Sequence, residues 1–204
     1  SLVLRHIAGV LELTAQQQAR GDVSADATLS AWDGAILLMY AVGLIDELPY
    51  LDSPQGSGTI TMSAAGAIDP QQPVSIPLTL TGADGVQSLE MSLRYDPAFL
   101  SFVSFVPSPE LTDALVEFED DRQTGRITIA AASSRPLAGT RKIGSVRFNV
   151  RQPPAEAITV SVAGVRLNEG GITENAAETT LTTAPGSFLG RIMPVPARST
   201  ARFA

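Results

Sequence analysis

The stretch Val86-Gln-Ser-Leu-Glu-Met-Ser-Leu-Arg-Tyr-Asp-Pro97 decides the fold. Apolar and polar residues alternate along it, which is the pattern of a β-strand with one buried face. Leu89, Met91 and Leu93 share that face and are expected in a core. The polar residues between them then face outward, and Tyr95-Asp96-Pro97 is expected to form the turn that follows.

The same alternation continues over residues 59–182. It recurs at 59–63, 74–80, 86–95, 100–106, 115–118, 126–130, 144–150, 158–162 and 178–182, with turn signals such as Thr124-Gly125 between these segments. About nine short strands in one domain-sized stretch predict a mainly β protein, built as a sandwich or a barrel.

Residues 1–50 have helical periodicity and contain an internal repeat. Residues 1–12 match residues 35–46 at an offset of 34, which aligns Gly9 with Gly43. Two helices packed face to face are expected, and Gly43 suits a helix end. Residues 49–58 contain two prolines followed by a Gly- and Ser-rich end, which indicates a linker. The expected division is a helical part at 1–48, the linker at 49–58, a β-domain at 59–183 and a tail at 184–204.

The loop from Asp22 to Asp33 is the motif with the clearest chemistry. Oxygen-bearing side chains stand at its positions 1, 3, 5, 9 and 12, the spacing of a 12-residue calcium loop. The ligands predicted for a Ca²⁺ ion are the side chains of Asp22, Ser24, Asp26 and Asp33, the backbone carbonyl of Thr28 and, through water, Ser30.

Two residues of this loop depart from the usual pattern. Position 6, where a sharp turn normally takes glycine, is Ala27, which tolerates a positive φ poorly. Position 3 is Ser24, a weaker ligand than Asp or Asn. The alternative is a polar loop in which Asp22 or Asp33 only caps a helix.

Composition excludes several classes of function. The net charge of −7 argues against nucleic-acid binding, which needs a basic surface. The absence of cysteine excludes disulfides, thiolate zinc sites and cysteine nucleophiles. His6 is the one histidine and lies in an apolar helix, so no catalytic triad can form. No apolar run is long enough to span a bilayer. We therefore expect no catalytic residues.

The helical part resembles a dockerin module. The resemblance rests on Gly21-Asp22-Val23, on the later loop residues up to Asp33 and on the apolar helix up to Gly43. Dockerins have two loop–helix repeats, which implies that residues 1–12 are the first helix and that its calcium loop precedes Ser1. In that family loop positions 10 and 11 help to read the partner. They are Ala31 and Trp32 here, where Ser/Thr pairs are common, so specificity cannot be transferred.

The β-domain resembles cohesin, the receptor of dockerins. The resemblance rests on the strand that ends in Tyr95-Asp96-Pro97 and on the ordered strands around it. It implies a jelly-roll β-sandwich that binds dockerin through one sheet face. Mapped strand for strand, the residues expected to face a partner are Ser88, Glu90, Ser92, Ala130 and Ala132. An ordinary solvated sheet face is the alternative, as a purely structural turn is for Tyr95-Asp96-Pro97.

The tail resembles the start of a type IX secretion sorting domain, with Pro194-Val195-Pro196 in place of the common Pro-Asn-Pro. This resemblance implies a bacterial protein that is secreted or held at the cell surface. Because no signal peptide opens the chain, a fragment is expected. The alternative is a Pro- and Arg-rich tail without fixed structure.

The expected function is non-catalytic protein–protein recognition in an extracellular scaffold, with dockerin- or cohesin-bearing chains as partners. A structural domain pair of a surface or filament protein is one alternative. A carbohydrate-binding module is another, which the lack of tryptophan in the β-domain disfavours. Because a cohesin-like receptor and a dockerin-like ligand are expected on one chain, head-to-tail self-assembly is an open alternative. The short linker is expected to keep the helical part from binding its own β-domain.

Overall fold

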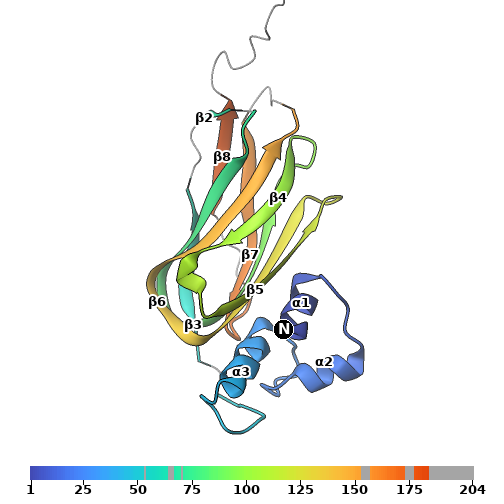
Figure 1. Ribbon diagram of the computed structural model, residues 1–204, viewed down its shortest axis with the longest axis vertical. Helices are drawn as coiled ribbons and strands as arrows, with labels where there is room; N and C mark the ends of the chain where they lie inside the picture. The colour runs from blue at the N-terminus through green and yellow to red at the C-terminus, as the bar shows by residue number, and fades with distance from the viewer. Residues whose placement is uncertain (53, 64–66, 70, 153–156, 173–176, 184–204) are drawn as a thin grey trace, which may run out of the picture.

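The structure is a computed structural model that describes residues 1–52, 54–63, 67–69, 71–152, 157–172 and 177–183. The described residues form three α-helices and eight strands, so the mainly β fold class is confirmed. Figure 1 shows the helices beside a set of long, twisted strands. The elements are α1 (Leu2–Ala8), α2 (Ala15–Gly21), α3 (Ala31–Ala41), β1 (Ser57–Met62), β2 (Ala67–Ile68), β3 (Val74–Arg94), β4 (Leu100–Pro107), the 3-10 turn η1 (Pro109–Leu111), β5 (Ala114–Asp121), β6 (Arg126–Val150), β7 (Ile158–Leu167) and β8 (Glu178–Thr183).

Two long strands, β3 and β6, bend so that each takes part in both layers of the sandwich. The first half of β3 pairs with β1 and with the second half of β6, and β4 lies beyond β6. The second half of β3 pairs with the first half of β6 and with β7, while β5 lies beyond β6 and β8 beyond β7. These pairs are antiparallel, whereas β2 pairs with β8 in parallel.

The structure has eight strands among the described residues, although about nine were predicted. Each predicted segment overlaps a strand, although 59–63 and 86–95 each run one residue past the strand end. Segments 74–80 and 86–95 are joined in β3, and 126–130 and 144–150 are joined in β6. The strands continue because β3 and β6 remain paired across the bends, where Gly82, Gly85 and Gly139 take φ of 63°, 65° and 75°. The two-residue strand β2 is the addition that alternation did not predict.

The sandwich core lies between the two layers. Leu89, Met91 and Leu93 are buried in it as predicted. Tyr95 joins them: its ring lies 5.1 Å from that of Phe148, and its hydroxyl donates to a carboxylate oxygen of Asp120 at 2.8 Å. Tyr95-Asp96-Pro97 therefore serves as a structural turn, which is the alternative that the sequence left open.

The internal repeat of the helical part is visible in the helix ends. Gly9 follows α1 with φ 88°, and Gly43 follows α3 with φ 72°. The Val10 N–H donates to the Arg5 carbonyl at 2.8 Å, and the Leu44 N–H donates to the Met39 carbonyl at 2.9 Å. The same cap thus recurs 34 residues further on, as the sequence offset predicts. None of the helices in the described part of the chain is long and apolar enough to cross a membrane.

Candidate functional site

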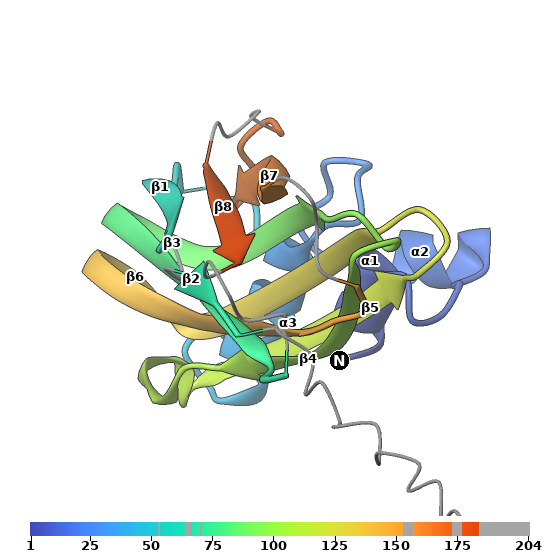
Figure 2. The same ribbon diagram turned by 90° about the horizontal axis from the view of Figure 1, so that it is seen from above.

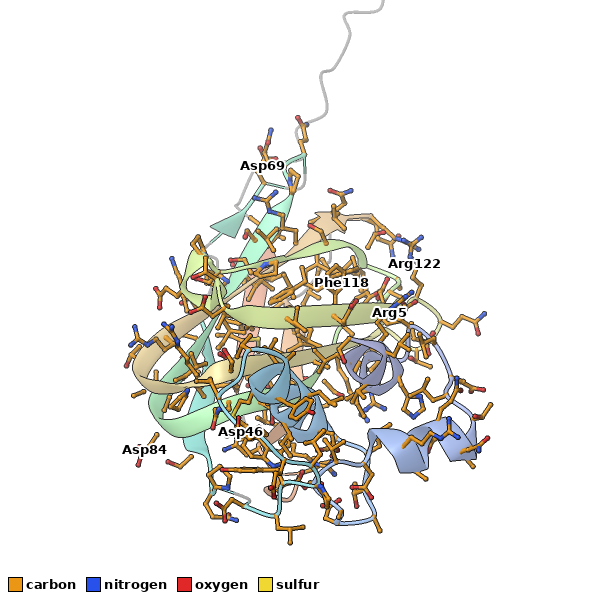
Figure 3. All side chains as sticks on the ribbon, turned by 60° about the horizontal axis from the view of Figure 1, so that its bottom comes forward. Arg5, Asp46, Asp69, Asp84, Phe118 and Arg122 are labelled. Carbon is orange, nitrogen blue, oxygen red and sulfur yellow. The ribbon has the colours of Figure 1, made fainter. Side chains whose placement is uncertain are left out.

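The helical segment (residues 1–41) lies on the outer face of the layer formed by β5, the first half of β6, the second half of β3 and β7. α3 contacts β6 and β3, and α1 contacts β5, β6 and α3. Figure 2 shows α2 to one side of the strands, and Figure 3 shows α1, with Arg5, and α3 side by side in front of the strands. Their contact has its own hydrophobic cluster, distinct from the sandwich core: Leu4, Ala8, Val23, Ala31, Trp32, Ala35, Ile36, Met39, Ala130 and Ala132.

The prediction that the linker would keep the helical part off its own β-domain is therefore wrong. Residues 42–56 can span roughly 50 Å when extended, about three times the length of α3. Two of its described residues also form hydrogen bonds with the rest of the molecule. The Tyr50 N–H donates to the Val23 carbonyl at 2.9 Å, and the Asn168 side chain donates to the Pro54 carbonyl at 2.9 Å.

The residues predicted to face a partner lie on this contact or beside it. On the sheet, Ser88, Ala130 and Ala132 are only 3%, 0% and 1% exposed, so the alternative of a solvated face is wrong for them. On the helix, Ala31 and Trp32 are 1% and 0% exposed. The predicted residues of the two parts are thus buried at one contact while the helical segment is docked.

Glu90 makes the clearest polar contact between the two parts. The backbone N–H of Ala31 donates to a carboxylate oxygen of Glu90 at 2.7 Å. The guanidinium of Arg166 lies 3.7 Å from the other oxygen. Burial raises the pKa of Glu90, although the Ala31 hydrogen bond and the charge of Arg166 oppose this shift.

Ser92 lies beyond the helices, on the part of the face that stays open. Its hydroxyl accepts hydrogen bonds from the Arg126 guanidinium at 2.8 and 3.3 Å. Ser92 also lines a cleft of about 240 Å³ between Ile7 of α1 and strands β3, β6 and β7. The helical segment therefore covers only part of the predicted face.

Gly34 is a contact residue that sequence reasoning missed. A Cβ added to it would lie 3.1 Å from a methyl of Leu4 and 3.5 Å from the Cβ of Ala132. A larger side chain would push α3 away from β6 or from α1. The sequence did contain a signal for this contact, because a glycine in a helix interior is commonly there to allow close packing.

The carboxylates of the predicted calcium loop accept hydrogen bonds from the loop's own N–H groups. Asp22 accepts from the N–H groups of Asp26 and Ala27 at 3.3 and 3.0 Å and from the Ser24 hydroxyl at 3.3 Å. Asp33 is fully buried and accepts from the N–H groups of Val23, Ser24 and Ser30 at 2.8, 3.0 and 2.9 Å. Ser30 and Asp33 also form the capping box of α3, so the capping role left open by the sequence is present.

The backbone of the loop makes the turn that a calcium loop requires. Ala27 has φ 67° and Ala25 has φ 59°, both in the left-handed region that favours glycine. The donor set is hard oxygen, which suits Ca²⁺. Among the described residues, however, no group of three or more His, Cys, Asp or Glu side chains is gathered to hold a metal. Asp22 forms hydrogen bonds with Ser24 and Asp26. The carboxylate oxygens of Asp33, in contrast, accept hydrogen bonds from backbone N–H groups.

A carboxylate of the β-domain reaches this loop, which the sequence did not predict. The Ser30 hydroxyl donates to Glu169 at 3.1 Å. Burial and a hydrogen bond to Asp26 raise the pKa of Glu169 to about 7. Burial opposes ionisation of Asp26 as well, but the hydrogen bonds from Glu169 and from the Thr28 N–H hold its pKa below the ordinary value. Nothing in the sequence signals this contact between residues 139 positions apart.

His6 has a structural place. Its Nδ1 accepts from the Leu13 N–H at 3.3 Å and so orders the turn that follows α1. The ring is half-buried and lies on the helical segment, away from the sandwich core.

Comparison with known proteins identifies the β-domain. A model of the cohesin domain matches residues 58–184. A non-cellulosomal cohesin from Archaeoglobus fulgidus has TM-score 0.53 and 18% identity, over 63% of this chain and 91% of that chain. The cohesin module of a Clostridium perfringens family 33 glycoside hydrolase has TM-score 0.52 and 13% identity, over 64% and 100%. A chain of a type I cohesin–dockerin complex from Clostridium thermocellum has TM-score 0.51 and 10% identity, over 63% and 99%.

At these identities the structural likeness shows the fold alone. The curated proteins contain no match. The family match covers the β-domain, so the dockerin-like identity of the helical segment stays a proposal. The tail resemblance at 184–204 lies outside the described residues.

Proposed function

This chain belongs to the cohesin family, and on that premise we propose that its sandwich recognises dockerin-like helical partners through the outer face of β3 and β6. Cohesin domains are non-catalytic binding modules, so the chain is not an enzyme. We call the face the recognition face and define it by Ser88, Glu90, Ser92, Ala130 and Ala132. The protein would serve as a scaffolding module that is secreted or held at the cell surface.

One observation carries this proposal. The recognition face holds a helical segment whose loop and helix resemble a dockerin repeat, with Ala31 and Trp32 at the contact. A pair of small residues, Ala130 and Ala132, lets α3 approach the sheet closely. The face is thus shaped for a helix with a small-residue surface.

We further propose that the loop binds calcium. Asp22, Ser24 and Asp26 would hold the ion by their side chains, with the Thr28 carbonyl and a water on Ser30. Asp33 would close the site by exchanging backbone N–H donors for the ion. Calcium supplies positive charge that offsets these carboxylates and stiffens the loop. Docking of the segment would then depend on calcium.

A structural domain pair is the competing interpretation. Its support is the complete burial of Trp32, which a permanent domain interface would also produce. The two interpretations differ in whether the helical segment can leave the face and bind in trans. A sugar-binding role has less support, since the large apolar side chains exposed on the described part of the sandwich are all aliphatic.

The decisive experiment is complementation between two full-length variants. Gly34→Glu places a large charged side chain on the helix side of the contact, so that α3 cannot dock and the recognition face of that chain is free. Ala132→Glu places the same charge on the sheet side, so that the helical segment of that chain cannot dock on its own sheet and is free. In a calcium buffer, each variant alone should be monomeric by light scattering, whereas their mixture should form a 1:1 dimer.

Two outcomes would count against the proposal. A mixture that stays monomeric, while both sandwiches still melt cooperatively, would support the structural pair. A dimer that chelator leaves intact would refute the calcium dependence alone. Asp26→Asn tests the loop itself, since asparagine keeps an acceptor for the Thr28 N–H. It should reduce the calcium-induced rise in Tm. Asp84→Asn is the matched control, because Asp84 is exposed on the bend of β3 and lies outside the loop.

A further inference from the structure

We infer that the helical segment closes the recognition face of its own sandwich, so that an external helical partner must displace it. This inference rests on the proposed function of the face. It differs from head-to-tail self-assembly, because the occupant is the same chain and the closed protein is a monomer.

The packing of the contact supports a specific seat for α3. Gly34 lies where a Cβ would stand 3.5 Å from that of Ala132, so the backbone of the helix comes close to the sheet. Ala31 and Ala35 add small side chains to the same cluster. Trp32 has no exposed surface, which makes it the largest anchor of the contact.

Polar contacts fix α3 at both ends. At its N-terminal end the Ala31 N–H donates to Glu90, and the Ser30 hydroxyl donates to Glu169. At its C-terminal end the amide of Gln87 donates to the sulfur of Met39 at 3.2 Å. The acceptors and donors on the sheet side come from β3 and from the loop after β7, so the sandwich itself determines where the helix lies.

The contact also contains groups that would gain from opening. Among the described residues, four buried side-chain polar atoms lack a hydrogen-bond partner, and three belong to Trp32, Ser88 and Arg166, at the contact or on its edge. A polar group that is buried without a partner loses its hydrogen bonds to water and gains none in the protein. The indole N–H of Trp32 would meet water when the segment leaves, which favours a detachable contact over a permanent core.

The connection makes closure strong even if the contact itself is weak. A tethered segment faces its site at an effective concentration on the order of millimolar. A free partner with the same contacts, present at micromolar concentration, must compete with that tethered copy. The affinity of the closed protein for an external segment is then reduced by the fraction of molecules that are open.

A disulfide lock tests closure in the full chain. The natural sequence has no cysteine, so Gly34→Cys/Ala132→Cys can form only one bond. The 3.5 Å between the two Cβ positions lies at the short end of the range for disulfides. Mild oxidation should give an intramolecular bond in a monomer, seen on a non-reducing gel and by mass, whereas either single-cysteine variant should not cyclise.

Binding of an external segment supplies the second readout. The probe is fluorescently labelled Ala132→Glu, which carries a free helical segment. The oxidised lock should not bind it, and the wild type should bind it about 10²–10⁴-fold more weakly than Gly34→Glu.

Each failure has its own meaning. Disulfide-linked dimers, no disulfide above the single-cysteine background, or a wild type that binds as tightly as Gly34→Glu would overturn closure. If Gly34→Glu itself does not bind the probe, the recognition function fails, even where the intramolecular bond forms.

Discussion

Replacement of Trp32 by alanine should release the helical segment and leave the sandwich folded. Trp32 is fully buried, and its cluster is distinct from the core between the two layers. Truncation of a buried Trp costs about 3–5 kcal/mol. That loss should fall on the helix–sheet contact, because none of the helical residues belongs to the sandwich core.

Hydrogen exchange measured peptide by peptide can locate the loss. Protection of α3 amides should fall roughly 10²- to 10⁴-fold, since each 1.4 kcal/mol changes an opening constant tenfold. Protection of β4, which lies in the other layer, should stay as in the wild type.

Tyr40→Ala is the matched control for this prediction. Tyr40 lies on the same helix and is 47% exposed, so its truncation should change stability by less than about 1 kcal/mol. Equal losses of protection in α3 and β4 would refute the idea of two separate cores. Equal effects of the two substitutions would refute the anchoring role of Trp32.

Three further predictions concern single residues. Ala27→Gly should raise the stability of the calcium-free loop by up to about 1 kcal/mol, because its φ of 67° strains alanine; a lower Tm would contradict this. Gly125→Ala should cost about 2–4 kcal/mol in urea unfolding, because φ is 65° and a Cβ would collide with the Tyr95 carbonyl. Gly139→Ala, with φ 75° and open space, should cost only about 1–2 kcal/mol, and equal losses would disprove the collision. Between pH 4.5 and about 7 the folded protein keeps the Glu169 proton that the unfolded chain releases, so calcium-free stability should fall as pH rises through this window. Glu169→Gln should flatten that slope, and an unchanged slope would assign it to other groups.

Alternation was enough to predict the sandwich, because burial of one strand face is a local property of the sequence. Leu89, Met91 and Leu93 lie in the core for that reason. The bends of β3 and β6 could not be predicted, since glycine at positive φ is compatible with both a chain reversal and a bend that keeps its pairing.

The contact between the helical segment and the sheet could not be predicted from the linker, but the sequence of β6 indicated it. Ala130, Ala131 and Ala132 are all buried, so β6 is covered on both faces there. A strand with small apolar residues at successive positions departs from the pattern of a half-solvated sheet. Glu169 gave no such hint, because its role depends on a contact that only the folded chain makes.

Acrylamide quenching of Trp32 in the wild type and in Ala132→Glu tests the central claim most directly. The chain has a single tryptophan, so the signal reports one place. Residue 132 is on the sheet and affects Trp32 only if the helix lies against it. We predict weak quenching in the wild type and several-fold stronger quenching in the variant. Equal quenching of the two proteins, with both sandwiches folded, would contradict the docking of the helical segment on the recognition face.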